Sequence, residues 1–288
     1  MAGFSGLRQI IDANNAGQVD IGFFRKTPSQ VTTAGIWFDL AMMPSVPAPL
    51  FYASSPLVAA QLKKSTDGGL NHGTSQSGYQ KHLQRFLMMS NSATGLPMPF
   101  ILCDYLMYYP FIDQSTNDEQ LLENPVTLPR FTDGKGVQIM VVGTNASGGS
   151  LPRFVVNYTN SDGVSGRTSA TMRMNAATAT GSIVTSTQGS QITSCPFMAL
   201  ADGDSGVRSI ESITFTSGTD IGLFCLVLVK PLLTGVLLEQ TAPTETVCNS
   251  DILSMPRIYD DAYLNLICLP NGSLSGVSLI GEIETVFN

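Results

Sequence analysis

The chain has 288 residues, a formal net charge of −7 and a charged fraction of 13%, about half of the roughly 25% usual in globular domains. This length can bury a sizeable core in one large β domain or two ordinary domains. Phosphate contacts need clustered Lys and Arg, so direct nucleic-acid binding is not expected of this acidic chain. The low charge predicts surface hidden in a stable homo-oligomer or larger assembly, with a hydroxyl-rich free surface as the alternative.

The cysteines and the apolar runs indicate in which cellular compartment the chain is made. The five cysteines are isolated in sequence, which predicts buried, reduced thiols and suits synthesis in a cytoplasm. A membrane partner is not expected, because the longest apolar run, 221–229, is well short of the about twenty residues that a spanning helix needs. A basic stretch followed by an apolar one is missing from the N-terminus, so no signal peptide is expected.

The N-terminal segment FSGLRQIIDANNAGQ (4–18) predicts one short helix. Ser5 is the expected N-cap and Gly17 the expected stop. Its apolar stripe consists of Leu7, Ile10 and Ile11.

Strands are predicted next, over VDIGFFRK (19–26) and AGIWFDLAM (34–42). The four prolines of PSVPAPLFYASSP (44–56) then exclude a helix and predict an extended arm. Such an arm can lie along a partner.

Residues 64–78 predict a polar loop, and YQKHLQRFLMMS (79–90) predicts a helix with Tyr79, Leu83, Phe86 and Leu87 on one side. In LPMPFILCDYLMYYPFID (96–113), prolines 97, 99 and 110 bracket a short helix or strand. TNDEQLLEN (116–124) predicts a capped helical turn or two, with Thr116 or Asn117 as the cap.

From residue 128 the pattern is that of short strands separated by Gly, Asn and Asp turns. The strands are expected at 137–143, 153–159, 167–174, 182–188, 208–216 and 221–230, and the tail from 240 onward combines an irregular stretch and the apolar segment 263–270 with a final strand at 276–287. Segment 153–174 predicts a hairpin through Asp162-Gly163, and 221–229 does not alternate, which predicts a strand covered on both faces.

The fold class expected is therefore mainly β, a β-sandwich or jelly roll with short helices in the N-terminal part. Its core is expected at 128–235, with an N-terminal part (1–127) and a C-terminal tail (236–288) that fold onto it, or with all three intertwined in one domain.

A tetrapeptide recurs as LPRF (128–131), LPRF (151–154) and MPRI (255–258). An arginine after a proline can pair with a carboxylate or carbonyls where a strand begins. We interpret Arg130, Arg153 and Arg257 as structural or interfacial anchors, or as coincident strand entries. The aromatic group of Tyr105, Tyr108, Tyr109 and Phe111 predicts core or interface, with sugar stacking as the weaker alternative.

The tetrad Gly-Asp-Ser-Gly (203–206) raises the question of a serine protease, because His82, Asp104 and Ser205 follow the chymotrypsin order. The family's second glycine after the serine is replaced by Val207, and neither histidine stands in the family's sequence context. We therefore expect a turn. An EF-hand is excluded by Val207 and Ile213, which leaves a loose calcium site of Asp202, Asp204 and Glu211 as an alternative.

Several segments resemble a family of otherwise uncharacterised proteins encoded by tailed bacteriophages. They are RKTPSQVTTAGIWFDLAMMPSVPAP (25–49), LPMPFILCDYLMYYPFID (96–113), TLPRFTDGKGVQ (127–138), YTNSDGVSGRT (158–168) and MPRIYDDAYLNLICLPNGSLSG (255–276). The resemblance spans most of the chain and brings no catalytic residues with it. It implies a structural protein located in the virion, assembled in the host cytoplasm, with other virion proteins and above all the major capsid protein as partners.

The expected role is that of a capsid cement, decoration or minor capsid protein that buries apolar surface and adds strands at sheet edges. A tail, baseplate or host-binding protein is the alternative, and its aromatic cluster would be exposed. A carbohydrate-active enzyme is the third reading, with Asp260/Asp261 or Asp118/Glu119 as the acidic pair in a cleft. Neither enzymatic activity nor a cofactor is expected.

Overall fold

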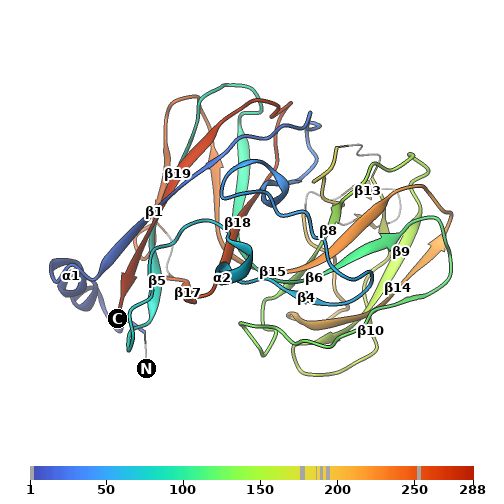
Figure 1. The fold of residues 1–288 in the computed structure, drawn as a ribbon, viewed down its shortest axis with the longest axis horizontal. Helices are drawn as coiled ribbons and strands as arrows, with labels where there is room; N and C mark the ends of the chain where they lie inside the picture. Colours follow the sequence, from blue (N-terminus) through green and yellow to red (C-terminus); the bar gives the residue numbers. More distant parts are fainter. Residues whose placement is uncertain (1–2, 176–178, 186, 189–190, 193–194, 252–253) are drawn as a thin grey trace.

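The computed structural model describes residues 3–175, 179–185, 187–188, 191–192, 195–251 and 254–288. It confirms the expected fold class, because the chain is mainly β and its named strands pair antiparallel. Two lobes lie side by side and share the long strands β6 and β15 (Figure 1). Neither helix of the described residues has the length and apolar sequence needed to cross a membrane.

The first sheet forms the outer wall of one lobe and joins the two ends of the chain, since β1 pairs with β19 along its whole length. In order, it contains β16 (Thr244–Val247), β5 (Lys81–Ser90), β19 (Leu279–Phe287), β1 (Val19–Lys26) and β3 (Ser45–Val46), with β17 (Arg257–Ile258) also beside β5.

The central sheet contains the two longest strands and runs through both lobes (Figure 1). In order, it contains β2 (Phe38–Asp39), β18 (Tyr263–Cys268), β6 (Met98–Asp113), β15 (Leu223–Leu237) and β8 (Gln138–Gly143), with β4 (Ala60–Gln61) beside β6.

The third sheet forms the outer wall of the other lobe. In order, it contains β10 (Arg167–Thr168), β9 (Arg153–Asn160), β14 (Val207–Ser217) and β7 (Gln120–Leu121), with β11 (Met172–Arg173) beside β9. The remaining elements are small: β12 (Thr187–Gln188) paired with β13 (Gln191–Ile192), helices α1 (Leu7–Asn15) and α2 (Lys64–Asp67), and a 3-10 turn at Leu40–Met42.

Two hydrophobic cores lie on opposite faces of the central sheet. On β15, Leu226 and Leu228 enter the core of the third sheet, whereas Val227 and Val229 enter the core of the first sheet. The expectation that 221–229 is covered on both faces is therefore confirmed for Phe224–Val229, whereas Ile221 is exposed. The first core also takes residues from 1–127, 128–235 and 236–288, such as Phe24, Val227 and Leu266, so the three ranges are intertwined around it.

Helix α1 forms where expected, but Gly6 and not Ser5 occupies the N-cap position. The Ser5 backbone N–H instead donates to the Gln9 side chain. Gly17 adopts a positive φ of 71° after the helix, as its role as a stop requires. The predicted strand at 34–42 is reduced to β2 and the 3-10 turn.

The proline-rich arm packs partly on its own chain. Tyr52 is buried and its hydroxyl donates to Asp39 Oδ2 at 2.5 Å. The buried Lys26 ammonium donates to the backbone oxygens of Met43 and Pro47. Phe51 remains exposed.

The predicted helix at 79–90 is wrong, because this segment is strand β5. A register shift against β19 makes Gln84 an extra residue, since Arg85 pairs with Glu284 and Leu83 with Thr285. This β-bulge places Leu83 and Phe86 on one face of the strand. Their spacing of three therefore imitates a helical stripe, and both side chains enter the first core.

Segment 96–113 is one long strand, β6, rather than a short element between prolines. Pro110 and Phe111 lie in a register shift opposite Cys225, because Tyr109 pairs with Leu226 and Ile112 with Phe224. A bulge tolerates a residue that donates no ladder hydrogen bond.

The predicted helical turn at 116–124 is also wrong. The Thr116 hydroxyl accepts a hydrogen bond from the Asp118 backbone N–H, so the expected cap closes a local turn. The following Gln120 and Leu121 form β7 beside β14.

The hairpin through Asp162-Gly163 is confirmed by the pairing of β9 with β10. The other predicted strands of the second half are present, those at 167–174 and 182–188 only as short pieces. Ser186 lies outside the described residues. Four cysteines are buried and free, and Cys195 is exposed.

Candidate functional site

The Gly-Asp-Ser-Gly tetrad lies in the tight turn that enters β14, at one end of the third sheet. Gly203 has a positive φ of 86°, a conformation that glycine adopts without strain. Gly206 is needed for another reason, since a Cβ there would lie 2.1 Å from the Gly134 backbone oxygen. Gly203 therefore serves the shape of this turn, and Gly206 serves its packing against the loop before β8.

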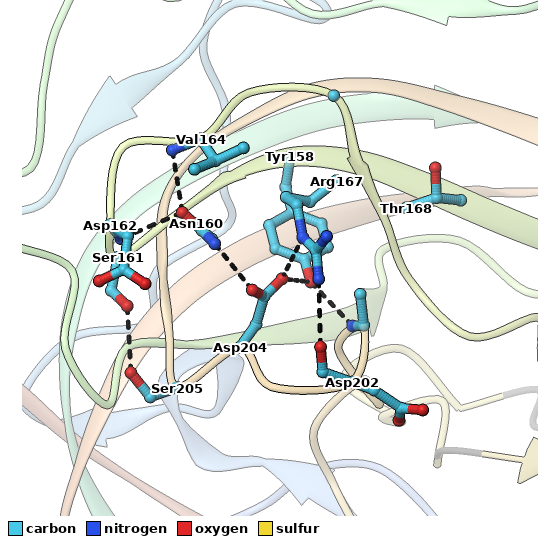
Figure 2. A network of polar contacts seen from close by, with 12 residues as sticks. Tyr158, Asn160, Ser161, Asp162, Val164, Arg167, Thr168, Asp202, Asp204 and Ser205 are labelled. Atoms are coloured by element: carbon cyan, nitrogen blue, oxygen red, sulfur yellow. Dashed lines mark hydrogen bonds and ion pairs between the residues drawn. The ribbon is translucent and has the colours of Figure 1, made fainter.

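Asp204 is the centre of a polar network between this turn and the β9–β10 hairpin (Figure 2). Its carboxylate accepts hydrogen bonds from the Tyr158 hydroxyl at 2.6 Å, the Asn160 amide at 2.7 Å and Arg167 Nε at 2.9 Å. The hydrogen bond from the Arg167 guanidinium is the main cause that lowers the pKa of Asp204 to about 2. The carboxylate is thus held ionised and fully occupied, as a clamp between two loops.

Within the described part of the chain, no base lies beside Ser205. Its Oγ lies 3.1 Å from Ser161 Oγ (Figure 2). His82 is on β5 of the first sheet with Nδ1 3.2 Å from the Met255 oxygen, and Asp104 is on β6 of the central sheet, paired with Arg130. The three members of the suspected triad therefore belong to three different sheets and bind other residues, as expected of a turn serine.

The alternative calcium site does not assemble either. Glu211 accepts from the Thr159 hydroxyl and the Gly166 N–H. Asp202 is exposed, and Figure 2 shows its carboxylate directed away from Asp204. Across the described residues, no group of three acidic, His or Cys side chains could hold a metal ion.

The two acidic pairs considered for glycosidase chemistry lie in turns. Asp261 is held by Ser65, whose N–H and hydroxyl donate to its carboxylate at 2.7 and 3.0 Å. Asp260 and Asp261 line a small pocket considered below. Asp118 and Glu119 are exposed, next to the turn that Thr116 closes.

Four of the six residues expected as interface anchors are buried within this chain: Arg130, Tyr105, Tyr108 and Tyr109. Their burial gives them a structural role within this chain, and an interfacial role for them stays a prediction. Arg130 makes a bidentate ion pair with Asp104, at 2.7 and 2.9 Å.

The hydroxyls of the buried tyrosines also have partners inside the chain. Tyr105 donates to Asp39, and Tyr109 donates to Asn124 and accepts from the Ile210 N–H. Of the four aromatic residues only Phe111 is exposed, so the cluster does not form an exposed aromatic platform for a sugar. Arg153 and Arg257 are exposed, so their interfacial role stays a prediction.

Two members of the Asp204 network, Tyr158 and Arg167, were not singled out from the sequence. They stand 46 and 37 residues before Asp204, and single-sequence patterns carry no signal for such contacts. The Asp-Gly turn at 162–163 indicated the hairpin that carries them, but not its partner turn.

Comparisons with known proteins give little. No family model matches the chain, and no curated protein matches it. One solved structure, described as "Structure of infectious bursal disease virus Gt strain", aligns over 94% of this chain and 79% of that chain, with 10% identity and a TM-score of 0.16. A TM-score this low carries no argument about fold or function.

The clamp at Asp204 has a testable pH dependence. Because the folded state lowers the pKa of Asp204 from 3.8 to about 2, its stabilising contribution is present above about pH 4 and is lost as the pH falls toward 2. We expect Asp204→Asn to lower the free energy of unfolding by about 1–3 kcal/mol at pH 6.

Urea unfolding at pH 6, 4, 3 and 2 measures this effect. The difference between wild type and Asp204→Asn should shrink across the lower range. Asp202→Asn is the matched control, because that carboxylate is exposed. A constant difference from pH 6 to 2 would contradict the clamp.

Proposed function

We propose that this chain is a structural protein of a phage virion, a cement, decoration or minor capsid protein that joins neighbouring coat subunits. The observation that supports this role most is a set of large apolar side chains left in solvent near the N-terminus. Half of the exposed large hydrophobic residues that the structure describes fall between residues 7 and 51: Leu7, Ile11, Ile21, Phe23, Val31, Val46 and Phe51.

Strand β1 combines such side chains with an open edge. Phe24 points into the first core, while Ile21 and Phe23 are 44% and 64% exposed on the opposite face. On one side β1 pairs with β19 throughout, whereas on the other β3 covers only Arg25 and Lys26. Among the described strands, none covers 19–24 on that side.

An unpaired strand edge beside exposed apolar side chains suits docking by strand addition. Backbone hydrogen bonds along the edge would supply affinity, and contacts to Ile21 and Phe23 would supply specificity. The apolar stripe of helix α1 is exposed as well, because Leu7 and Ile11 are not packed in a core. Contiguous exposed apolar surface marks interaction sites, and Ile21 and Phe23 share one face of β1.

Phe23→Ser tests this role. We expect the purified wild-type chain to co-sediment with heads of the phage that encodes it, prepared without this chain, and the variant to lose most of that binding while it keeps its β circular dichroism. Ile221→Ser is the matched control, because Ile221 is equally exposed but precedes β15 at the third-sheet lobe.

Quantitative mass spectrometry of intact particles then separates the alternatives. Hundreds of copies on the head support a cement or decoration protein. A handful at one vertex would instead favour the tail or baseplate role, and absence of the chain from purified particles would overturn a virion role.

A further inference from the structure

A small pocket gathers positive charge in this acidic chain. Its lining includes Lys81 and Arg257, where β5 and β17 begin, and Lys63, which precedes α2, and its volume is about 280 Å³. Its cationic lining comes from four separate places in the sequence: Lys63, Lys81, Arg130 and Arg257. Two of these are the arginines of the recurring Pro-Arg pattern, at 128–131 and 255–258, so the structure brings these two segments to one site.

The cations of this pocket are incompletely neutralised. Arg130 is paired with Asp104 through Nε and Nη2, but its Nη1 is buried and has no hydrogen-bond partner among the described residues. In the described part of the chain, no carboxylate lies within ion-pair distance of Lys63, Lys81 or Arg257. An unsatisfied buried donor of a charged group is costly, so an anionic acceptor would relieve it.

Lys81 is charged at neutral pH although it is buried. Desolvation, and then the repulsion of Lys64, lower its pKa to about 8, which still leaves the ammonium protonated near pH 7. Its ammonium lies 3.3 Å from His72 Nδ1 and 5.4 Å from the centroid of the Phe287 ring. It therefore adds positive charge to the pocket wall.

The other walls are aromatic and acidic. The Tyr259 ring makes an edge contact with Phe131, with centroids 5.1 Å apart, and carries the Arg257 guanidinium 4.3 Å from its centroid. Tyr79 lies on the lining as well. Asp260 and Asp261 also line the pocket, and because their repulsion of an anion grows with its charge, they disfavour phosphate more than a singly charged anion.

We propose that this pocket binds a small organic carboxylate, with the anionic end at Arg130 and Arg257 and a small apolar body against Tyr79 and Tyr259. The volume sits at the lower end of ligand sites, which suits a compound about the size of benzoate or the carboxyl-terminal residue of another chain. This site is independent of the proposed virion role, because neither Ile21 nor Phe23 is among the residues that line the pocket.

Titration of the full chain with benzoate, followed by amide NMR, tests the proposal. We expect saturable shifts of the backbone amides of 79–81 and 257–261, and none with neutral benzamide. Inorganic phosphate that shifts these amides as strongly as benzoate would overturn the assignment of a carboxylate. N-acetylphenylalanine separates the two sources: tighter binding than benzoate assigns the site to a chain terminus, and equal or weaker binding to a free carboxylate.

Variants of the exposed Arg257 and the half-buried Lys63 complete the test. Arg257→Gln should weaken benzoate binding about tenfold, since a hydrogen bond to a charged group is lost, and Lys63→Gln should weaken it less. Arg153→Gln is the matched control, because Arg153 follows a proline in the same pattern but is exposed on the other lobe. Unchanged affinity in both Arg257→Gln and Lys63→Gln, or no saturable shift in the wild type, would overturn the proposal.

Discussion

Asp104→Ala is expected to lower the free energy of unfolding by about 3–5 kcal/mol, because it leaves a buried guanidinium without its counter-charge. The side chains of Asp104 and Arg130 are 2% and 4% exposed, and two hydrogen bonds of 2.7 and 2.9 Å join them. Arg130 also donates to the backbone oxygens of Leu62 and Tyr105, which ties the loop before β8 to β6. Chemical unfolding at pH 7 measures the loss.

The pair itself need not stabilise the fold by that amount. Burial raises the pKa of Asp104 to about 6 in spite of the attraction of Arg130. Desolvation of the carboxylate therefore costs more free energy than the ion pair returns. We therefore expect the double variant Asp104→Leu/Arg130→Met to recover much of the stability lost in Asp104→Ala. A double variant as unstable as the single one would show that the lost stability comes from altered packing at this site and not from the unpaired charge of Arg130.

The local patterns predicted those strands whose environment is regular. Alternation over 153–160 matches a strand with one buried face, and the Asp-Gly dipeptide specified its hairpin. The unbroken apolar run at 221–229 indicated two covered faces, which the two cores of the central sheet provide. The run could not indicate that these faces belong to different lobes, because that depends on pairing with distant strands.

The errors have a common origin in local irregularity. At β5 a bulge at Gln84 turned a strand into an apparent helical stripe, and at β6 a bulge absorbed Pro110 within a long strand. A bulge is stabilised by the partner strand, and the partner of β5, β19, lies nearly 200 residues away. The sequence of either segment alone therefore favours the wrong element.

For the candidate site, the sequence predicted only which chemistry is absent, namely that of a serine hydrolase. The replacement at Val207 and the positions of the histidines argued against a hydrolase, and the geometry of Ser205 agrees with a turn. The partners of Asp204 and of Arg130 depend on long-range packing. The recurring Pro-Arg pattern was visible, but the convergence of Arg130 and Arg257 on one pocket was not.

The second large effect is expected for Phe224→Ala, which should lower the free energy of unfolding by about 3–5 kcal/mol. Phe224 begins the buried part of β15 and contacts the rings of Phe154 and Phe215 in the core of the third-sheet lobe. Its neighbour Cys225 points into the other core. A cavity beside this strand should therefore weaken both lobes, because β6 and β15 run through both.

The single tryptophan makes this coupling measurable, since Trp37 lies in the first core. We expect the urea midpoint of Trp37 fluorescence to fall in Phe224→Ala together with the midpoint of far-UV circular dichroism. Phe100→Ala is the matched variant in the first core and should shift both signals in the same way. If Trp37 keeps its wild-type midpoint in Phe224→Ala, the lobes unfold separately. Coincident shifts instead make the shared strands the reason that two β-sandwich lobes behave as one cooperative unit.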